Sequence, residues 1–155
     1  LKWTYADNTH HDFYVEKNGN ILVLSQAFVE SHDRLKNLYY PALACYIVTL
    51  SPEGKELERV GVLDLFANSP YTPMLGSSAQ PWDVTHTNSI ERLEPEIAGA
   101  FPMFKPGQVL LSFRSLNAIA VADLPTKSLV WAYQGMWRGQ HAARFMPNGH
   151  IALFD

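Results

Sequence analysis

The sequence predicts an all-β fold made of the four-stranded antiparallel blades of a β-propeller. Three observations support this: short apolar runs recur along the 155 residues, strong turn signals separate the runs, and one motif is repeated. Each run has about 5 to 7 residues with the alternation or the β-branched content of a strand. The strands are predicted at residues 20–25, 44–50, 108–113, 118–123, 128–133 and 150–154.

Turn chemistry joins these runs into hairpins, because glycine, proline and asparagine supply the backbone angles that tight turns require. The strongest signals are Asn18-Gly19, Ser51-Pro52-Glu53-Gly54, Pro106-Gly107, Pro125-Thr126-Lys127 and Pro147-Asn148-Gly149. Few stretches show helical spacing. The best of them, residues 28–40, lacks capping residues and is expected to form a loop or a short helix.

An internal repeat sets the period of the fold. Six residues separate His11 from Asn18-Gly19, and six separate His141 from Asn148-Gly149. A looser copy begins at His86 and reaches Pro106-Gly107 after an insertion. The resulting unit of roughly 55 to 75 residues fits one four-stranded blade with an added loop.

A blade buries its two faces only against neighbouring blades, and propellers close with about 4 to 8 of them. Residues 1–155 hold about two blades and the start of another, so we expect one partial propeller domain from a larger protein. The sequence leaves open how many blades the intact protein has and whether it is a homo-oligomer.

The composition narrows the function classes. A hydrophobic content of 47% and a charged content of 17% indicate a globular chain, and a net charge of -3 with scattered Lys and Arg argues against nucleic acid as a partner. No apolar run approaches the roughly 20 residues of a membrane-spanning helix. Cys45 is the only cysteine, so no internal disulfide is expected. A phosphate-binding glycine loop and a serine-hydrolase elbow are both missing from the sequence.

Three histidines occupy the position just before the first predicted strand of each repeat: His11, His86 and His141. The innermost strand of a blade lies along the propeller axis, so these side chains are expected to meet at one mouth of the central channel. A neutral imidazole is a competent nucleophile at neutral pH.

The residues around these histidines form an ordered set of motifs that resembles the arylsulfotransferase family. The likeness is dense over residues 83–155 and sparser over residues 1–82. The motifs are His10-His11-Asp12, Asp83-Val84-Thr85-His86-Thr87-Asn88-Ser89, Ser112-Phe113-Arg114, Asn117-Ala118-Ile119, Trp131 before Gly135, Gln140-His141 and Asn148-Gly149 before Ile151.

The resemblance implies a propeller enzyme that needs neither a cofactor nor a nucleotide sulfate donor. An aryl sulfate would give its sulfuryl group to an enzyme histidine, which passes it to a phenol. The family's nucleophile matches His141, and its other site positions match His11, His86, Asn88 and Arg114. Ala142 departs from the family pattern, in which an acidic residue often follows the nucleophile. Export to the periplasm or out of the cell is common in the family, although no leader is expected in residues 1–7.

Each matched residue has a physically sensible role. Arg114 and Asn88 can donate hydrogen bonds to the sulfuryl oxygens, at a typical contribution of about 3 kcal/mol each. His11 or His86 could protonate the departing phenolate, with His10 as the competitor of His11. Trp137, and less directly Tyr5, could stack on the aryl ring.

Two other functions compete with this interpretation. Three converging histidines and Asp12 could bind zinc, but no His-x-x-x-His pair supports this and we predict no metal. A propeller can also be a binding scaffold without activity. His32 and His150 match no motif and are expected to be structural or solvated.

Overall fold

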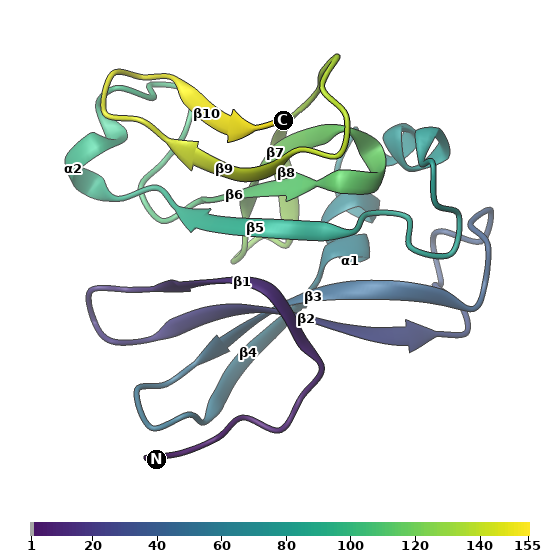
Figure 1. Ribbon diagram of the computed structural model, residues 1–155, viewed down its shortest axis with the longest axis horizontal. Coiled ribbons are helices and arrows are strands. Elements are labelled where there is room, and N and C mark those ends of the chain that lie inside the picture. The colour runs from purple at the N-terminus through teal and green to yellow at the C-terminus, as the bar shows by residue number, and fades with distance from the viewer. Residues whose placement is uncertain (1) are drawn as a thin grey trace.

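A computed structural model describes residues 2–155 as two four-stranded antiparallel sheets and one two-stranded sheet (Figure 1). In each sheet the strand order follows the chain, which confirms the prediction of sequential antiparallel hairpins. The first sheet contains β1 (Thr9–Val15), β2 (Ile21–Val29), β3 (Ala42–Leu50) and β4 (Glu56–Gly61). The second contains β5 (Thr87–Arg92), β6 (Val109–Phe113), β7 (Ala118–Asp123) and β8 (Ser128–Gln134), and the third β9 (His141–Phe145) and β10 (Ile151–Phe154).

The repeated turn closes the first hairpin of every sheet in the same way. Gly19, Gly107 and Gly149 have φ angles of 87°, 90° and 82°, which a residue with a side chain rarely adopts. Each of these glycines donates its backbone N–H to the carbonyl of the residue directly after the first strand, namely Glu16, Leu93 and Met146. In the second sheet the predicted insertion lies within this turn and includes the short helix α2 (Pro95–Ala98).

The first strands of the three sheets lie side by side. β1 packs against β5, and β5 packs against β9. Asn88 near the start of β5 contacts Gln140 just before β9, and Glu91 near the end of β5 contacts Phe145 at the end of β9. The two strands therefore run in the same direction, as the innermost strands of successive propeller blades do.

Two apolar cores lie between the sheets and join them. The larger lies between the first and second sheets, where Ile47, Phe66 and Phe113 are almost fully buried. Helix α1 (Val62–Ala67) follows β4 and buries four side chains in this core. A second core, around Phe101 and Phe145, joins the second sheet to the third. These cores hold the first strands at fixed spacings.

The structure corrects the sequence analysis at several elements. The segment 30–41 is a loop, which agrees with one of the two expectations for residues 28–40. Strand β2, however, extends to Val29, and the α-helices lie elsewhere, at α1 and α2. Short 3-10 helices η1 (Thr72–Ser77) and η2 (Arg114–Leu116) were not predicted. Within residues 2–155 no helix is long and apolar enough to cross a membrane.

The strand that follows each Asn-Gly turn is the second strand of its sheet, and the sequence analysis took it for the first. Only His86 therefore directly precedes its first strand, whereas His11 lies within β1 and His141 begins β9. The first strands β1, β5 and β9, with the outer strand β4, were missed because their polar residues hide the strand pattern.

Candidate active site

The three predicted histidines meet at the end of the sheets where the first strands begin. The Nε2 atoms of His11 and His86 lie 3.0 Å apart. The ring centroids of His11 and His141 are separated by 6.2 Å. One imidazole thus comes from each of the three sheets, and His11 contacts the other two rings.

A β-bulge interrupts each first strand at this end. Residues with positive φ angles lie in these bulges or just before them, namely His11 (58°), His86 (43°) and Ala142 (52°). Such angles are uncommon for residues with a side chain and are concentrated at functional sites. A bulge redirects side chains from their regular alternation, so the local backbone explains how the rings turn toward one another.

Asp83 anchors the second histidine. Its Oδ2 atom accepts a hydrogen bond from Nδ1 of His86. The Asp83 side chain is 6% exposed, against 28% for His86. This contact leaves the Nε2 atom of His86 directed at His11. Asp83 belongs to the sequence motif around His86 without a predicted role, and its position three residues before a histidine is the signal that could have indicated this contact.

Burial lowers the pKa of His11 below its ordinary value, and the neighbouring His86 and His141 rings lower it further. Asp83 acts in the opposite direction, and Arg114 adds to the lowering. His11 is therefore neutral at neutral pH.

His10 lies behind His11, with ring centroids 5.0 Å apart. Burial, and then the His11 ring, lowers its pKa as well. The Nε2 atom of His10 is buried without a hydrogen-bond partner in the part of the chain that the structure describes. His11, rather than His10, is the residue that contacts the other two site histidines.

Arg114 is the first residue of η2 and contacts His86 through the backbone. Its backbone N–H donates to the carbonyl of His86 at 3.1 Å. The side chain is exposed and forms no ion pair with any residue in 2–155. The Arg114 side chain lies against Gly139: a Cβ atom placed on this glycine would be 3.7 Å from Nε of Arg114. An exposed guanidinium beside the histidines is suited to an anionic group.

Asn88 is buried, and its amide nitrogen makes a hydrogen bond, whereas its Oδ1 atom has no partner within residues 2–155. Nδ2 donates to the carbonyl of Gln140 at 2.7 Å, so the side chain holds the peptide that precedes His141. The Gln140 side chain is fully buried and donates to Ser112 Oγ and to the carbonyls of Phe113 and Ala118. These bonds fix the start of β9 to the second sheet. The role of Asn88 as a donor to the sulfuryl oxygens stays a prediction, and the structure shows its contact with Gln140.

Asp12 links all three first strands. Its Oδ2 atom accepts from the backbone N–H of Ile90 at 3.1 Å and from Nη2 of Arg144 at 3.0 Å. The zinc hypothesis uses the Asp12 carboxylate as a metal ligand, but in the structure this carboxylate is hydrogen-bonded to residues of β5 and β9. Among residues 2–155 no group of three or more His, Cys, Asp or Glu side chains has the arrangement of a metal site.

The two aromatic candidates lie apart from the histidine contacts. Trp137 packs against the second core, with its ring centroid 5.8 Å from that of Tyr133. Its indole N–H is buried and unpartnered within the described residues. Tyr5 contacts Glu56 and Arg59 at the outer strand of the first sheet. No described contact joins either ring to His11, His86 or His141.

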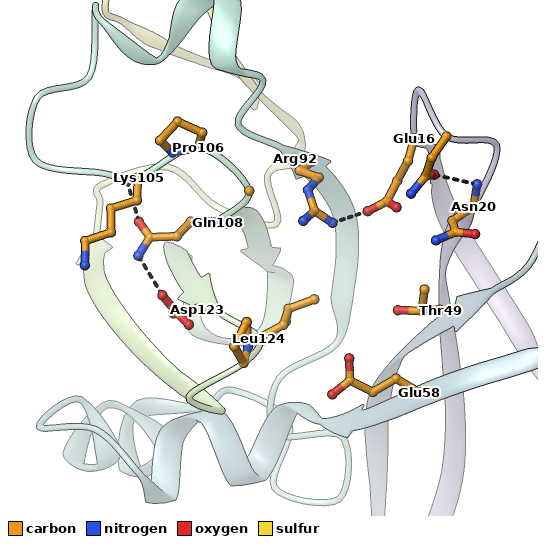
Figure 2. A pocket seen from close by; sticks show the side chains of 13 residues that line it. Glu16, Asn20, Thr49, Glu58, Arg92, Lys105, Pro106, Gln108, Asp123 and Leu124 are labelled. Atoms are coloured by element: carbon orange, nitrogen blue, oxygen red, sulfur yellow. Dashed lines mark hydrogen bonds and ion pairs between the residues drawn. The ribbon is translucent and has the colours of Figure 1, made fainter.

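A wider cleft than the hollow at the histidines lies at another place. Its volume is about 420 Å³, and it lies at the turn end of the first two sheets. Figure 2 shows Arg92 paired there with Glu16. Lys105, Gln108 and Asp123 line its other side. It contains none of the predicted site residues. A smaller hollow of about 240 Å³ borders His11 and Phe13.

Comparison with known proteins gives one match. The family model described as Arylsulfotransferase (ASST) matches residues 4–155. No curated protein and no solved structure matches the chain. The match therefore extends over residues 4–82, where the motif likeness is sparser.

Proposed function

Since this chain belongs to the arylsulfotransferase family, we propose that it transfers a sulfuryl group from an aryl sulfate to a phenol through a covalent intermediate on His141. Membership supports arylsulfotransferase-type activity in general, and the β-sheets are blades of the propeller that this family forms. We propose the covalent mechanism, the donor and the acceptor beyond that general activity. The main observation in favour of the proposal is that the side chains of His11, His86 and His141 lie close together.

In the first half of the reaction an imidazole nitrogen of His141 attacks the sulfur atom. A nitrogen–sulfur bond forms while the bond between sulfur and the aryl oxygen breaks, and its electron pair leaves with the phenolate. A proton from the His11–His86 pair, whose Nε2 atoms are 3.0 Å apart, neutralises the phenolate oxygen.

In the second half a phenol attacks the sulfur of sulfohistidine. The His11–His86 pair now accepts the phenolic proton, and the nitrogen–sulfur bond breaks to regenerate His141. Dividing one displacement into two lets the same proton-carrying pair act as acid and then as base. No nucleotide is required in either half.

Arg114 supplies positive charge to the sulfuryl oxygens. Its exposed guanidinium has no competing ion pair among the described residues, and it is close enough to His11 to lower that residue's pKa. Preorganised donors of this kind stabilise charge that develops in the transition state by about 3 kcal/mol. Asn88 acts one step further away, because its amide holds the Gln140 peptide next to His141.

The direct test is turnover of 4-nitrophenyl sulfate with phenol as acceptor and without any nucleotide donor, using the full-length protein. We expect nitrophenol release that depends on phenol and is lost in His141→Ala. The matched control is His150→Ala, which changes an exposed histidine outside the site. Full turnover by folded His141→Ala would reject the covalent role of His141.

A further inference from the structure

Among residues 2–155, Asp83 is the one buried carboxylate in direct contact with a site histidine. The sulfuryl-transfer mechanism proposed above does not use it. It lies three residues before His86, and the positive φ angle of His86 turns the ring back toward it. Asp83 Oδ2 meets Nδ1 of His86, and Asp83 Oδ1 is buried without a partner in the described chain.

The surrounding backbone holds this pair in place. The carbonyls of Thr85 and His86 accept hydrogen bonds from the N–H groups of Ser115 and Arg114, at 3.3 and 3.1 Å. The carbonyl of Trp82, the residue before Asp83, accepts a hydrogen bond from the backbone N–H of Leu43 near the start of β3. Asp83 and His86 are thus fixed between the first and second sheets.

The charge balance gives the contact its chemical meaning. A buried carboxylate without a positive partner is costly, and no Lys or Arg in residues 2–155 forms an ion pair with Asp83. His86 is the group that can supply the compensating charge. A carboxylate on Nδ1 also fixes the tautomer and the ring orientation, which leaves Nε2 for the reaction.

The His11–His86 contact places one proton between two nitrogens. At 3.0 Å one Nε2 atom donates and the other accepts. Of the two rings, His86 is the one in contact with a carboxylate, so we assign the shared proton to its Nε2 atom. The sequence analysis left open whether His11 or His86 is the acid; Asp83 distinguishes them.

We propose that Asp83 is a positioning residue that makes His86 the general acid for the departing phenolate and the general base for the acceptor phenol. This inference rests on the proposed function and deepens it. His86 gives the Nε2 proton to the phenolate oxygen as the sulfur–oxygen bond breaks, while Asp83 retains its hydrogen bond to Nδ1. In the second half His86 takes the acceptor's proton back at Nε2.

The test is the dependence of the rate on the leaving group in Asp83→Asn. A good leaving group such as 4-nitrophenolate needs little protonation, whereas unsubstituted phenolate needs much more. General acid catalysis is worth about 10²–10⁴-fold, so we expect kcat/KM to fall by about 10²-fold or more for phenyl sulfate and by about tenfold or less for 4-nitrophenyl sulfate. The ratio between donors does not depend on the folded fraction of a preparation.

The matched control is Asp64→Asn. Asp64 also contacts a histidine, with its Oδ1 3.2 Å from Nε2 of His32, but this pair lies outside the site. We expect the control to leave both rates unchanged. An equal loss with both donors, or no loss with either, in Asp83→Asn would overturn the inference.

A double-mutant cycle covers the case in which Asp83→Asn folds poorly. Asp83 acts only through His86, so in a His86→Gln background Asp83→Asn should leave the ratio of kcat/KM between the two donors unchanged. A further change of this ratio in that background would also overturn the inference. The proposed function fails separately, through the absence of His141-dependent turnover in the unmodified protein.

Discussion

The Nε2 atoms of His11 and His86 lie 3.0 Å apart although 75 positions separate the two residues in the chain. The contact joins the first strand of one blade to the segment that enters the first strand of the next. Because both strands run along the same axis, their starting ends meet, and His11 and His86 both have positive φ angles where their rings approach each other. The geometry of the blades is therefore what assembles the site.

Arg114→Gln tests the anion-binding role. The side chain is exposed and unpaired within the described residues, so its loss should leave folding intact. Removing one preorganised donor typically lowers kcat by about 10²–10³-fold, and we expect a fall of that size with 4-nitrophenyl sulfate. Arg34→Gln, which alters an exposed arginine bonded to Asn68, is the control. Equal activity of the two variants would remove Arg114 from the mechanism.

Asn88→Leu tests the positioning contact to Gln140. Leucine retains the shape of asparagine but cannot donate to the Gln140 carbonyl, which lies 2.7 Å from Nδ2. Leaving a buried acceptor with a weaker partner costs about 1–3 kcal/mol, to be measured as the free energy of unfolding in urea. We expect kcat to fall as well, because the peptide before His141 is released. The exposed Asn37→Leu serves for comparison, and a loss no greater than in that variant would contradict the contact's importance.

Asp12→Ala tests the link between the three first strands. The change leaves the Ile90 N–H without its acceptor and Arg144 without its carboxylate. We predict a loss of about 1–3 kcal/mol in the free energy of unfolding. Asp33→Ala, at an exposed position, should stay within about 0.5 kcal/mol of the unmodified protein. If both variants are equally stable, the Asp12 contacts do not hold the sheets together.

The lowered pKa values of His10 and His11 predict acid sensitivity. In each case burial favours the neutral ring, so the folded protein binds protons less readily than the unfolded chain. This contribution to stability is complete above the unfolded pKa of about 6.5 and is lost as the pH falls through the lower folded values. The double variant His10→Gln/His11→Gln should therefore lose less thermal stability than the unmodified protein between neutral pH and about pH 5.

That comparison also controls for other groups. Burial raises the pKa of Glu91, which acts with the opposite sign, but this effect is common to both proteins and cancels in the difference. Identical pH profiles of melting temperature would show that the two histidines titrate alike in the folded and unfolded states.

The sequence predicts the strands that are apolar and misses those that are not. Residues 108–113 and 118–123 are identified because β6 and β7 are buried on both faces. In β4, by contrast, Glu56, Glu58 and Arg59 are exposed and conceal the strand. The first strands are not predicted because their polar residues, such as Thr87, Asn88 and Ser89 in β5, hide the strand pattern. Helix α1 has six residues and no side-chain cap, so it resembles a short apolar strand.

The site residues follow from motifs more readily than their contacts do. His11, His86 and His141 share a position relative to the repeated turn or to the family pattern, and the structure brings them together. The Asp12–Arg144 pair joins residues 132 positions apart and depends on blade packing that no local pattern encodes. The same is true of Asn88 and Gln140, whose contact could be found only in three dimensions.

The covalent intermediate is tested most directly by locating the sulfuryl group. The full-length protein would be mixed with 4-nitrophenyl sulfate without an acceptor, quenched above neutral pH and analysed by mass spectrometry of the intact protein and of its peptides. We predict a gain of about 80 Da, carried by the peptide that contains His141 and removed on addition of phenol. Nitrophenol released at the full rate without any adduct, or an adduct on another residue that turns over with phenol, would contradict the mechanism.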